Sequence, residues 1–145
     1  MKKLLFLFVI IGSLLSCGHD DANPESQFDS EKFPQKWQLV AVQGSSIANS
    51  PVETGSYGIF YILNADNTIS KTGEINGLTK TINGKYIFKE VAKDKYLEIT
   101  YDADDELIEN CYSTPVEELY VKSDSELLGT SAMCDRPKLW YRRVE

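Results

Sequence analysis

The amino-acid sequence predicts an all-β fold, a single antiparallel up-and-down barrel of about eight to ten strands. From residue 35 onward, apolar residues come in short runs rich in Val, Ile, Tyr and Phe, and turn residues separate the runs, which is typical of strands. No segment after residue 16 has a convincing helical period over about ten residues. Most connections are too short for crossovers between parallel strands, which need about a dozen residues. Closure into a barrel removes exposed edges, and a two-sheet sandwich is the alternative.

Residues 1–16 have the layout of a secretory signal peptide. Lys2 and Lys3 are followed by residues 4–15, which are apolar apart from Ser13. A helix needs roughly 20 apolar residues to cross the hydrocarbon core of a bilayer, and this stretch is shorter. We therefore expect a cleaved signal peptide, with a permanent membrane span as the weaker alternative.

Residues 14–17, Leu-Leu-Ser-Cys, resemble the lipobox of bacterial lipoproteins. In that family the resemblance implies cleavage after Ser16 and attachment of lipid to Cys17. One acyl chain gives marginal membrane binding, whereas several anchor a protein stably. The resemblance therefore implies a lipoprotein of the cell envelope, held in the outer membrane on its periplasmic face or at the cell surface. An ordinary secretory signal that leaves a free cysteine is the alternative.

Residues 17–34 are polar and acidic and contain Pro24, so they cannot bury enough apolar surface to fold. We expect a flexible tether. Asp20 and Asp21 resemble the surface-export signal of lipoproteins from the Bacteroides group, although a solvated spacer explains them nearly as well.

The remaining residues, 35–145, are expected to form one domain. Two of the 15 basic residues lie in 1–16, so the mature chain has 13 basic and 22 acidic residues, a net charge of −9. No basic stripe is present to meet phosphates. We therefore exclude nucleic acid as a principal partner.

The expected strands follow one another at short intervals. They cover 37–42, 57–63, 68–72, 78–82, 85–89, 96–101, 107–112, 118–121, 126–128 and 139–143. Asn83 and Gly84, between two of these runs, form the strongest two-residue hairpin signal in the chain. The run 57–63 is apolar on both faces, which is typical of a strand covered on both sides. Residues 43–55 are rich in Gly, Ser and Asn and are expected to form a long connection or a lid.

Two further patterns are candidates for a metal site and for a disulfide. The acidic run 102–106 lacks the spacing and the glycine of an EF-hand, so we expect a solvated hairpin turn and no metal site. Cys111 and Cys134 would meet an oxidising compartment, and a disulfide between them would stabilise the fold by roughly 3 kcal/mol. Two unpaired thiols are the alternative, and neither cysteine has the CxxC spacing of a redox or zinc site.

Several runs together resemble the small lipocalin-like domains of lipoproteins from the Bacteroides group. The resemblance spans 35–143 and rests on 37–39, 63–68, 84–86, 120–128 and 141–143. It implies a calycin-type β-barrel behind the lipoprotein signal. In lipocalins the tryptophan of the first strand closes one barrel end under an arginine of the last strand, so the resemblance gives these parts to Trp37 and to Arg142 or Arg143. Such a cation–π contact contributes about 0.5–2 kcal/mol.

The aromatic side chains of the strands are mostly amphipathic and could line a pocket for a lipid or planar molecule. The candidate ligand-binding residues are Phe60, Tyr86, Phe88, Tyr96 and Tyr120. The alternative is that these rings simply fill the core, because aromatic residues favour strands in general.

An enzyme is not expected. The chain has one histidine, His19, which lies in the tether, so the domain lacks the usual general base. No pattern marks catalytic residues, and no cofactor is expected. The first hypothesis is a lipid-anchored protein that binds a small hydrophobic ligand in its barrel. The second is a non-enzymatic accessory or interaction subunit of an outer-membrane complex, with a filled barrel that docks through its outer surface or through 43–55. An enclosed apolar cavity favours the first, and a filled interior with an exposed apolar patch favours the second.

Overall fold

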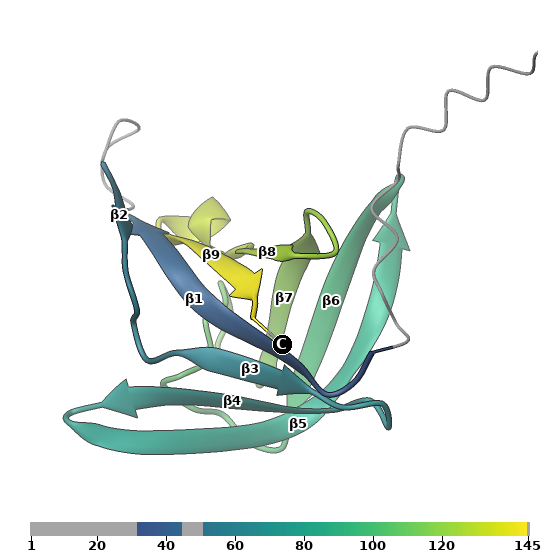
Figure 1. Ribbon diagram of the computed structural model, residues 1–145, viewed down its shortest axis with the longest axis horizontal. Coiled ribbons are helices and arrows are strands. Elements are labelled where there is room, and N and C mark those ends of the chain that lie inside the picture. Colours follow the sequence, from purple (N-terminus) through teal and green to yellow (C-terminus); the bar gives the residue numbers. More distant parts are fainter. Residues whose placement is uncertain (1–31, 45–50, 145) are drawn as a thin grey trace, which may run out of the picture.

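The computed structural model describes residues 32–44 and 51–144 (Figure 1). The expected signal peptide, Cys17, His19 and most of the tether lie outside these residues. Within the described ranges, no helix is long and apolar enough to cross a membrane. The elements are β1 (Gln35–Gln43), β2 (Val52–Thr54), β3 (Phe60–Leu63), β4 (Thr68–Ile75), β5 (Leu78–Val91), β6 (Asp94–Tyr101), β7 (Val116–Val121), β8 (Glu126–Gly129), the 3₁₀ helix η1 (Ser131–Cys134) and β9 (Lys138–Arg143).

The strands form one antiparallel sheet that closes on itself. Its order is β2-β1-β3-β4-β5-β6-β7-β8-β9, and β1 also pairs with β9, which lies beside it in Figure 1. Among the described strands, β1 and β3 to β9 thus make an eight-stranded up-and-down barrel, and β2 is an additional strand beside β1. The predicted all-β antiparallel barrel is confirmed.

Alternate side chains of the strands point into the barrel. In β7, for example, Glu117, Leu119 and Val121 are buried, while the residues between them are half-buried. This alternation builds one continuous apolar core, which is the main source of stability in a domain of this size. The core consists of Trp37, Leu39, Tyr61, Leu63, Ile69, Tyr86, Leu97, Ile99, Tyr101, Ile108, Leu119, Val121, Leu127, Leu139 and Tyr141.

The predicted hairpin at Asn83 and Gly84 is wrong. Both residues lie inside β5, whose pairing with β4 and β6 continues through this point. The turn comes earlier, at Asn76 and Gly77, which have positive φ angles of 52° and 76°. Gly84 serves close packing rather than a turn, because a Cβ on it would lie 2.4 Å from the Thr100 carbonyl oxygen.

The predicted strand over 107–112 is also wrong. These residues belong to the connection between β6 and β7, and the acidic run 102–106 is the first part of this connection rather than a hairpin turn. Leu107 and Ile108 are each only 6% exposed. Leu107 packs against Gly73, where an added Cβ would lie 2.6 Å from the leucine side chain. The apolar run therefore covers one end of the barrel.

The chain between β1 and β3 differs from the prediction in two ways. β2 forms within the expected connection 43–55, so part of that segment adds a strand to the sheet. β3 is shorter than the run 57–63 and has one buried face, with Tyr61 and Leu63 inside and Phe60 half-buried outside. Lys36 places its Nζ 4.8 Å from the centroid of the Phe60 ring, so a long side chain covers part of the outer face.

Candidate functional site

The barrel interior contains a buried ion pair. Lys71 of β4 and Glu117 of β7 both point inward and are almost completely buried. The Lys71 Nζ lies 2.9 Å from Glu117 Oε1 and 3.1 Å from Oε2. A buried charge is tolerated where it has a partner of opposite charge and further hydrogen bonds.

Two tyrosines supply those further hydrogen bonds. The Tyr61 hydroxyl donates to Glu117 Oε1 at 2.8 Å, and the Tyr101 hydroxyl donates to Oε2 at 2.7 Å. The Lys71 Nζ also lies 5.0 Å from the centroid of the Tyr61 ring. Each carboxylate oxygen of Glu117 therefore accepts one bond from the lysine and one from a tyrosine.

The same surroundings keep the tyrosines protonated. Burial, followed by the negative charge of Glu117, raises the pKa of Tyr61, of Tyr101 and of Tyr141 above the ordinary value for tyrosine. Tyr141 joins the group through its ring, whose centroid lies 4.9 Å from that of Tyr61. The Tyr61 and Tyr101 hydroxyls are consequently donors and not general bases, while the buried Tyr141 hydroxyl has no hydrogen-bond partner among the described residues.

Among the described residues, the side chains around this cluster leave no space wide enough for a water molecule. A side chain that borders a space wide enough for water retains accessible surface, yet Tyr61, Glu117 and Tyr141 have none. The same holds for several of their apolar neighbours, namely Trp37, Leu63, Leu97, Ile99 and Leu127. Within the part of the chain that the structure describes, the ion pair is therefore part of a tightly packed core.

Sequence reasoning did not find this pair, although a signal was present. Lys71 stands two positions after Ile69, and Glu117 stands two positions before Leu119, so both share the parity of buried strand residues. A charged residue in phase with an inward-facing series predicts a buried charge. The identity of its partner depends on which strands meet across the barrel.

Of the three residues predicted to close the barrel end, the structure places Trp37 and Arg143 on one face of the sheet and Arg142 on the other. Trp37 is completely buried, and its Nε1 donates to Gln35 Oε1 at 3.1 Å. Arg143 lies opposite Trp37 in the β1–β9 register, and its Nη2 donates to the Lys32 carbonyl oxygen at 3.3 Å. Arg142 is exposed on the outer face. Of the two arginines, Arg143 is therefore the one that shares a face with the tryptophan.

The five candidate ligand-binding aromatics do not line one cavity. Tyr86 is buried inside the barrel, where its hydroxyl donates to the Asn64 carbonyl oxygen at 2.7 Å. Phe88, on the same face, is 40% exposed and packs edge-on against Tyr86 at 5.7 Å between centroids. The other three, Phe60, Tyr96 and Tyr120, lie on the outer face. The ring centroids of Tyr96 and Tyr120 are 5.6 Å apart, and Phe60 lies on β3, away from both.

Cys111 and Cys134 form a disulfide whose Cα atoms are 5.6 Å apart. The bond joins the β6–β7 connection to η1, so it holds the segment that covers the barrel end. Tyr112 and Met133, the neighbours of the two cysteines, are 75% and 88% exposed. Large apolar side chains with so much exposure beside a fixed covalent link are candidates for contact with another molecule.

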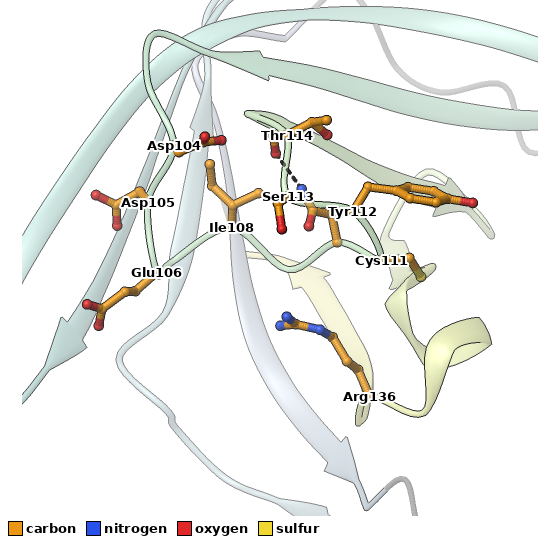
Figure 2. Close-up of a pocket in the computed structure, with 10 residues that line it drawn as sticks. Asp104, Asp105, Glu106, Ile108, Cys111, Tyr112, Ser113, Thr114 and Arg136 are labelled. Carbon is orange, nitrogen blue, oxygen red and sulfur yellow. Dashed lines mark hydrogen bonds between the residues drawn. The ribbon is translucent and has the colours of Figure 1, made fainter.

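A cleft of about 480 Å³ lies beside this disulfide. Figure 2 shows the side chains that line it. Its acidic side chains lie on one side, Arg136 enters from the other, and Tyr112 is turned away from the acidic group. The charges serve the local structure, because Asp105 pairs with Lys80 and Arg136 donates to Glu109 at 3.2 Å. The hydrogen bond with Lys80 lowers the pKa of Asp105, although burial opposes this shift.

Metal binding has no support in the described ranges, where no group of three His, Cys, Asp or Glu side chains is placed to hold an ion. The sealed core, the disulfide-linked connection and the exposed surface beside it are the features from which a function can be argued. No protein-family model, curated protein or solved structure matches the chain.

Proposed function

We propose that this chain is a lipid-anchored envelope protein of the lipocalin-like lipoprotein type, without enzymatic activity, that acts as an accessory or interaction subunit through its outer surface. The observation that carries the proposal is the complete burial of the inner side chains around Lys71 and Glu117. When the interior of a barrel is filled, only the side chains on its outer surface can contact another molecule. Residues 14–17 and Cys17 support the anchor, and the polar residues after them support a tether.

The packing of the core weighs against a hydrophobic ligand inside the barrel. Such a ligand would have to displace inward side chains that border no water-sized space, among them Tyr61 and Leu97. It would also have to open the surroundings of the Lys71–Glu117 pair, and separating a buried pair costs about 3–5 kcal/mol.

The surface beside the disulfide is the best candidate for contact with another envelope protein. A groove of about 510 Å³ runs past Tyr112, Met133 and the disulfide onto the outer face of β6 and β7. Because the disulfide already fixes the backbone here, covering these side chains requires little further ordering of the main chain. This surface therefore supports the interaction role.

Site-specific photo-crosslinking in intact cells tests the interaction role. A benzophenone amino acid at Tyr112 or Met133 is expected to give discrete adducts with another envelope protein, whereas the same label at Lys95, on an exposed strand end, is expected to give none. Mass spectrometry of lipid extracts from the purified protein supplies the second measurement. A co-purified molecule at one per chain, together with no adducts, would reverse the choice between the two hypotheses.

The anchor is tested by Cys17→Ala. Without the thiol no thioether can form, so the variant is expected to move from the membrane fraction to the soluble fraction of the envelope. A Cys111→Ala, Cys134→Ala double variant that keeps Cys17 serves as the control for loss of a thiol. Continued recovery of Cys17→Ala with membranes would reject lipidation.

A further inference from the structure

A groove of about 360 Å³ lies on the outer face of the barrel, over β1, β2 and β9. Ala41 lies in it between Thr54 of β2 and Trp140 of β9, its partners in the strand register. The remaining lining residues are Val40, Val52, Glu126 and Arg142. Its lining is more apolar than polar, and it lies apart from the cleft in Figure 2. None of the residues predicted to bind a ligand contributes to it.

A β-bulge creates the hollow. The β1–β9 register pairs Leu39 with Tyr141 and then Ala41 with Trp140, so Val40 is the extra residue. The shift brings Ala41 between Trp140 on one side and Thr54 of β2 on the other. Because the alanine side chain is a single methyl group, it leaves a depression between the side chains of Thr54 and Trp140.

Two basic side chains stand on either side of Trp140 along β9, on a protein that is acidic as a whole. Lys138 lies two positions before Trp140 and Arg142 two positions after it, so the three side chains share the outer face of β9, while Leu139 and Tyr141 are buried. The Lys138 Nζ lies 5.1 Å from the centroid of the Trp140 ring.

The arginine that lines the groove is available to a ligand. In the part of the chain that the structure describes, the Arg142 guanidinium makes no ion pair. Glu126, its neighbour in the β8–β9 register, instead pairs with Lys122 at 2.8 Å. The whole chain has a net charge of −7, so a local excess of two cations beside an aromatic ring stands out from its surroundings. A guanidinium beside an apolar surface matches a carboxylate, sulfonate or phosphate that carries an apolar group.

We propose that this groove binds a small amphipathic anion, with the anionic head on Arg142 and a flat or short apolar body against Trp140, over Ala41. The volume is at the low end of the range of about 300–1,000 Å³ for ligand pockets, which favours a small molecule over a folded partner. Such a site goes beyond the proposed interaction role and depends on different residues.

The test uses the mature lipidated chain in nanodiscs of neutral phosphatidylcholine, labelled with 5-fluorotryptophan, and the probe 2-naphthoate. The chain has two tryptophans, so Trp140 reports on the groove, and the completely buried Trp37 reports on the integrity of the core. Saturable movement of the Trp140 fluorine resonance with 2-naphthoate, and none with the uncharged 2-naphthamide, is expected. The Trp37 resonance is expected to stay in place.

The variant Arg142→Gln is expected to raise the dissociation constant of 2-naphthoate by about tenfold or more, because it removes a charged hydrogen-bond donor. Arg136→Gln is the matched control, since it removes another exposed arginine and should leave the constant unchanged. Ala41→Leu fills the depression and is expected to abolish binding, with an unmoved Trp37 resonance to show that the core is intact.

Three results would overturn the proposal. The first is an equal response to 2-naphthoate and 2-naphthamide, and the second is an equal affinity of Arg142→Gln and Arg136→Gln. The third is movement of the Trp140 resonance with nanodiscs that contain phosphatidylglycerol but not with 2-naphthoate, which would assign this face to an anionic bilayer. None of these results affects crosslinking at Tyr112 or Met133, so failure of the two proposals is distinguishable.

Discussion

Glu117 shows how a single side chain connects distant parts of this barrel. Its two oxygens accept hydrogen bonds from Lys71, Tyr61 and Tyr101, which lie on three other strands. Such a carboxylate specifies which residues must meet in the interior. Removal of one partner leaves the other charge buried and unpaired, which lowers the free energy of unfolding.

The first prediction concerns this pair. Lys71→Met is expected to lower the free energy of unfolding by about 3 kcal/mol, the low end of the range for a broken buried pair, because two tyrosines still donate to the carboxylate. Urea denaturation measures the loss. The double variant Lys71→Met, Glu117→Leu is expected to recover part of it, because no charge then remains buried.

Lys122→Met is the matched control for this prediction. It breaks an ion pair with Glu126 in which the lysine side chain is 49% exposed, so the expected loss is below about 1 kcal/mol. If Lys71→Met costs no more than this control, the interior pair is not the charged centre of the core.

Single residues also mark the limit of the sequence reasoning. The parity of Lys71 and Glu117 with their apolar neighbours is visible in the sequence, but their contact is not, because 46 positions separate them. The register of every intervening strand determines whether they meet. Trp37 was placed at a barrel end through resemblance alone, and the choice between Arg142 and Arg143 needed the pairing of β1 with β9.

At the level of elements, β5 shows why a strong local signal failed. Asn-Gly is favoured in two-residue hairpin turns because both residues tolerate positive φ. Asn76 and Gly77 offer the same chemistry seven positions earlier, and the chain turns there. Gly84 has a different reason to lack a side chain, namely the close backbone of β6.

The second prediction tests this reading of Gly84. Gly84→Ala is expected to lower the free energy of unfolding by about 1–3 kcal/mol, because the new methyl group would overlap the Thr100 carbonyl oxygen. Thermal unfolding followed by circular dichroism measures the change. Gly55→Ala is the control, since nothing lies within 4 Å of the methyl group there. Equal midpoints for the two variants would contradict the assignment of Gly84 to a close approach.

The connection between β6 and β7 was misassigned for a related reason. A short apolar run can be a strand or a plug, and periodicity alone does not separate the two. Here Leu107 and Ile108 cover the barrel end, and Asn110 uses its side-chain amide to bond the carbonyl oxygens of Thr114 and Val116. These bonds hold the backbone before β7 in an irregular path.

The third prediction concerns the disulfide that fixes this connection. Replacing Cys111 and Cys134 by alanine is expected to lower the free energy of unfolding by roughly 3 kcal/mol, because 23 positions separate the two cysteines. Hydrogen exchange is expected to accelerate most at the amides of residues 102–115 and less in the strands. Uniform acceleration across the whole sheet would show that the bond supports the barrel rather than this segment.

For the molecule as a whole, the strand spacing was enough to predict a closed antiparallel barrel. Short connections leave few topologies open, and closure satisfies the edges that a meander exposes. What the sequence did not supply is whether the barrel is hollow. That depends on the summed volume of the inward side chains, in which Trp37, Tyr61 and Tyr141 are the largest fully buried residues.

The fourth prediction is a loss of stability at alkaline pH. Burial raises the pKa of Tyr61, Tyr101 and Tyr141, so above about pH 10 the folded chain keeps protons that the unfolded chain releases. Stability is then complete below that pH and falls above it, by about 1.4 kcal/mol per pH unit for each such tyrosine. Urea unfolding between about pH 9 and 11 measures the slope.

An absorbance titration of the phenolate band provides the companion measurement. At least three of the eight tyrosines are expected to stay protonated until the protein unfolds. Titration of all eight together near pH 10 would show that the interior admits water.

The ladder between β1 and β9 also governs the order of assembly. Trp37 of β1 is the register partner of Arg143 of β9. The first strand of the barrel therefore gains this neighbour only when the last strand is present. Most neighbouring strands can pair one hairpin at a time. The β1–β9 pairing joins residues from opposite ends of the domain, so it has the largest entropic cost of loop closure. During synthesis from the N-terminus, the sheet therefore keeps unpaired edges and exposed apolar surface until β9 has been made. Protection by chaperones matters most during that interval.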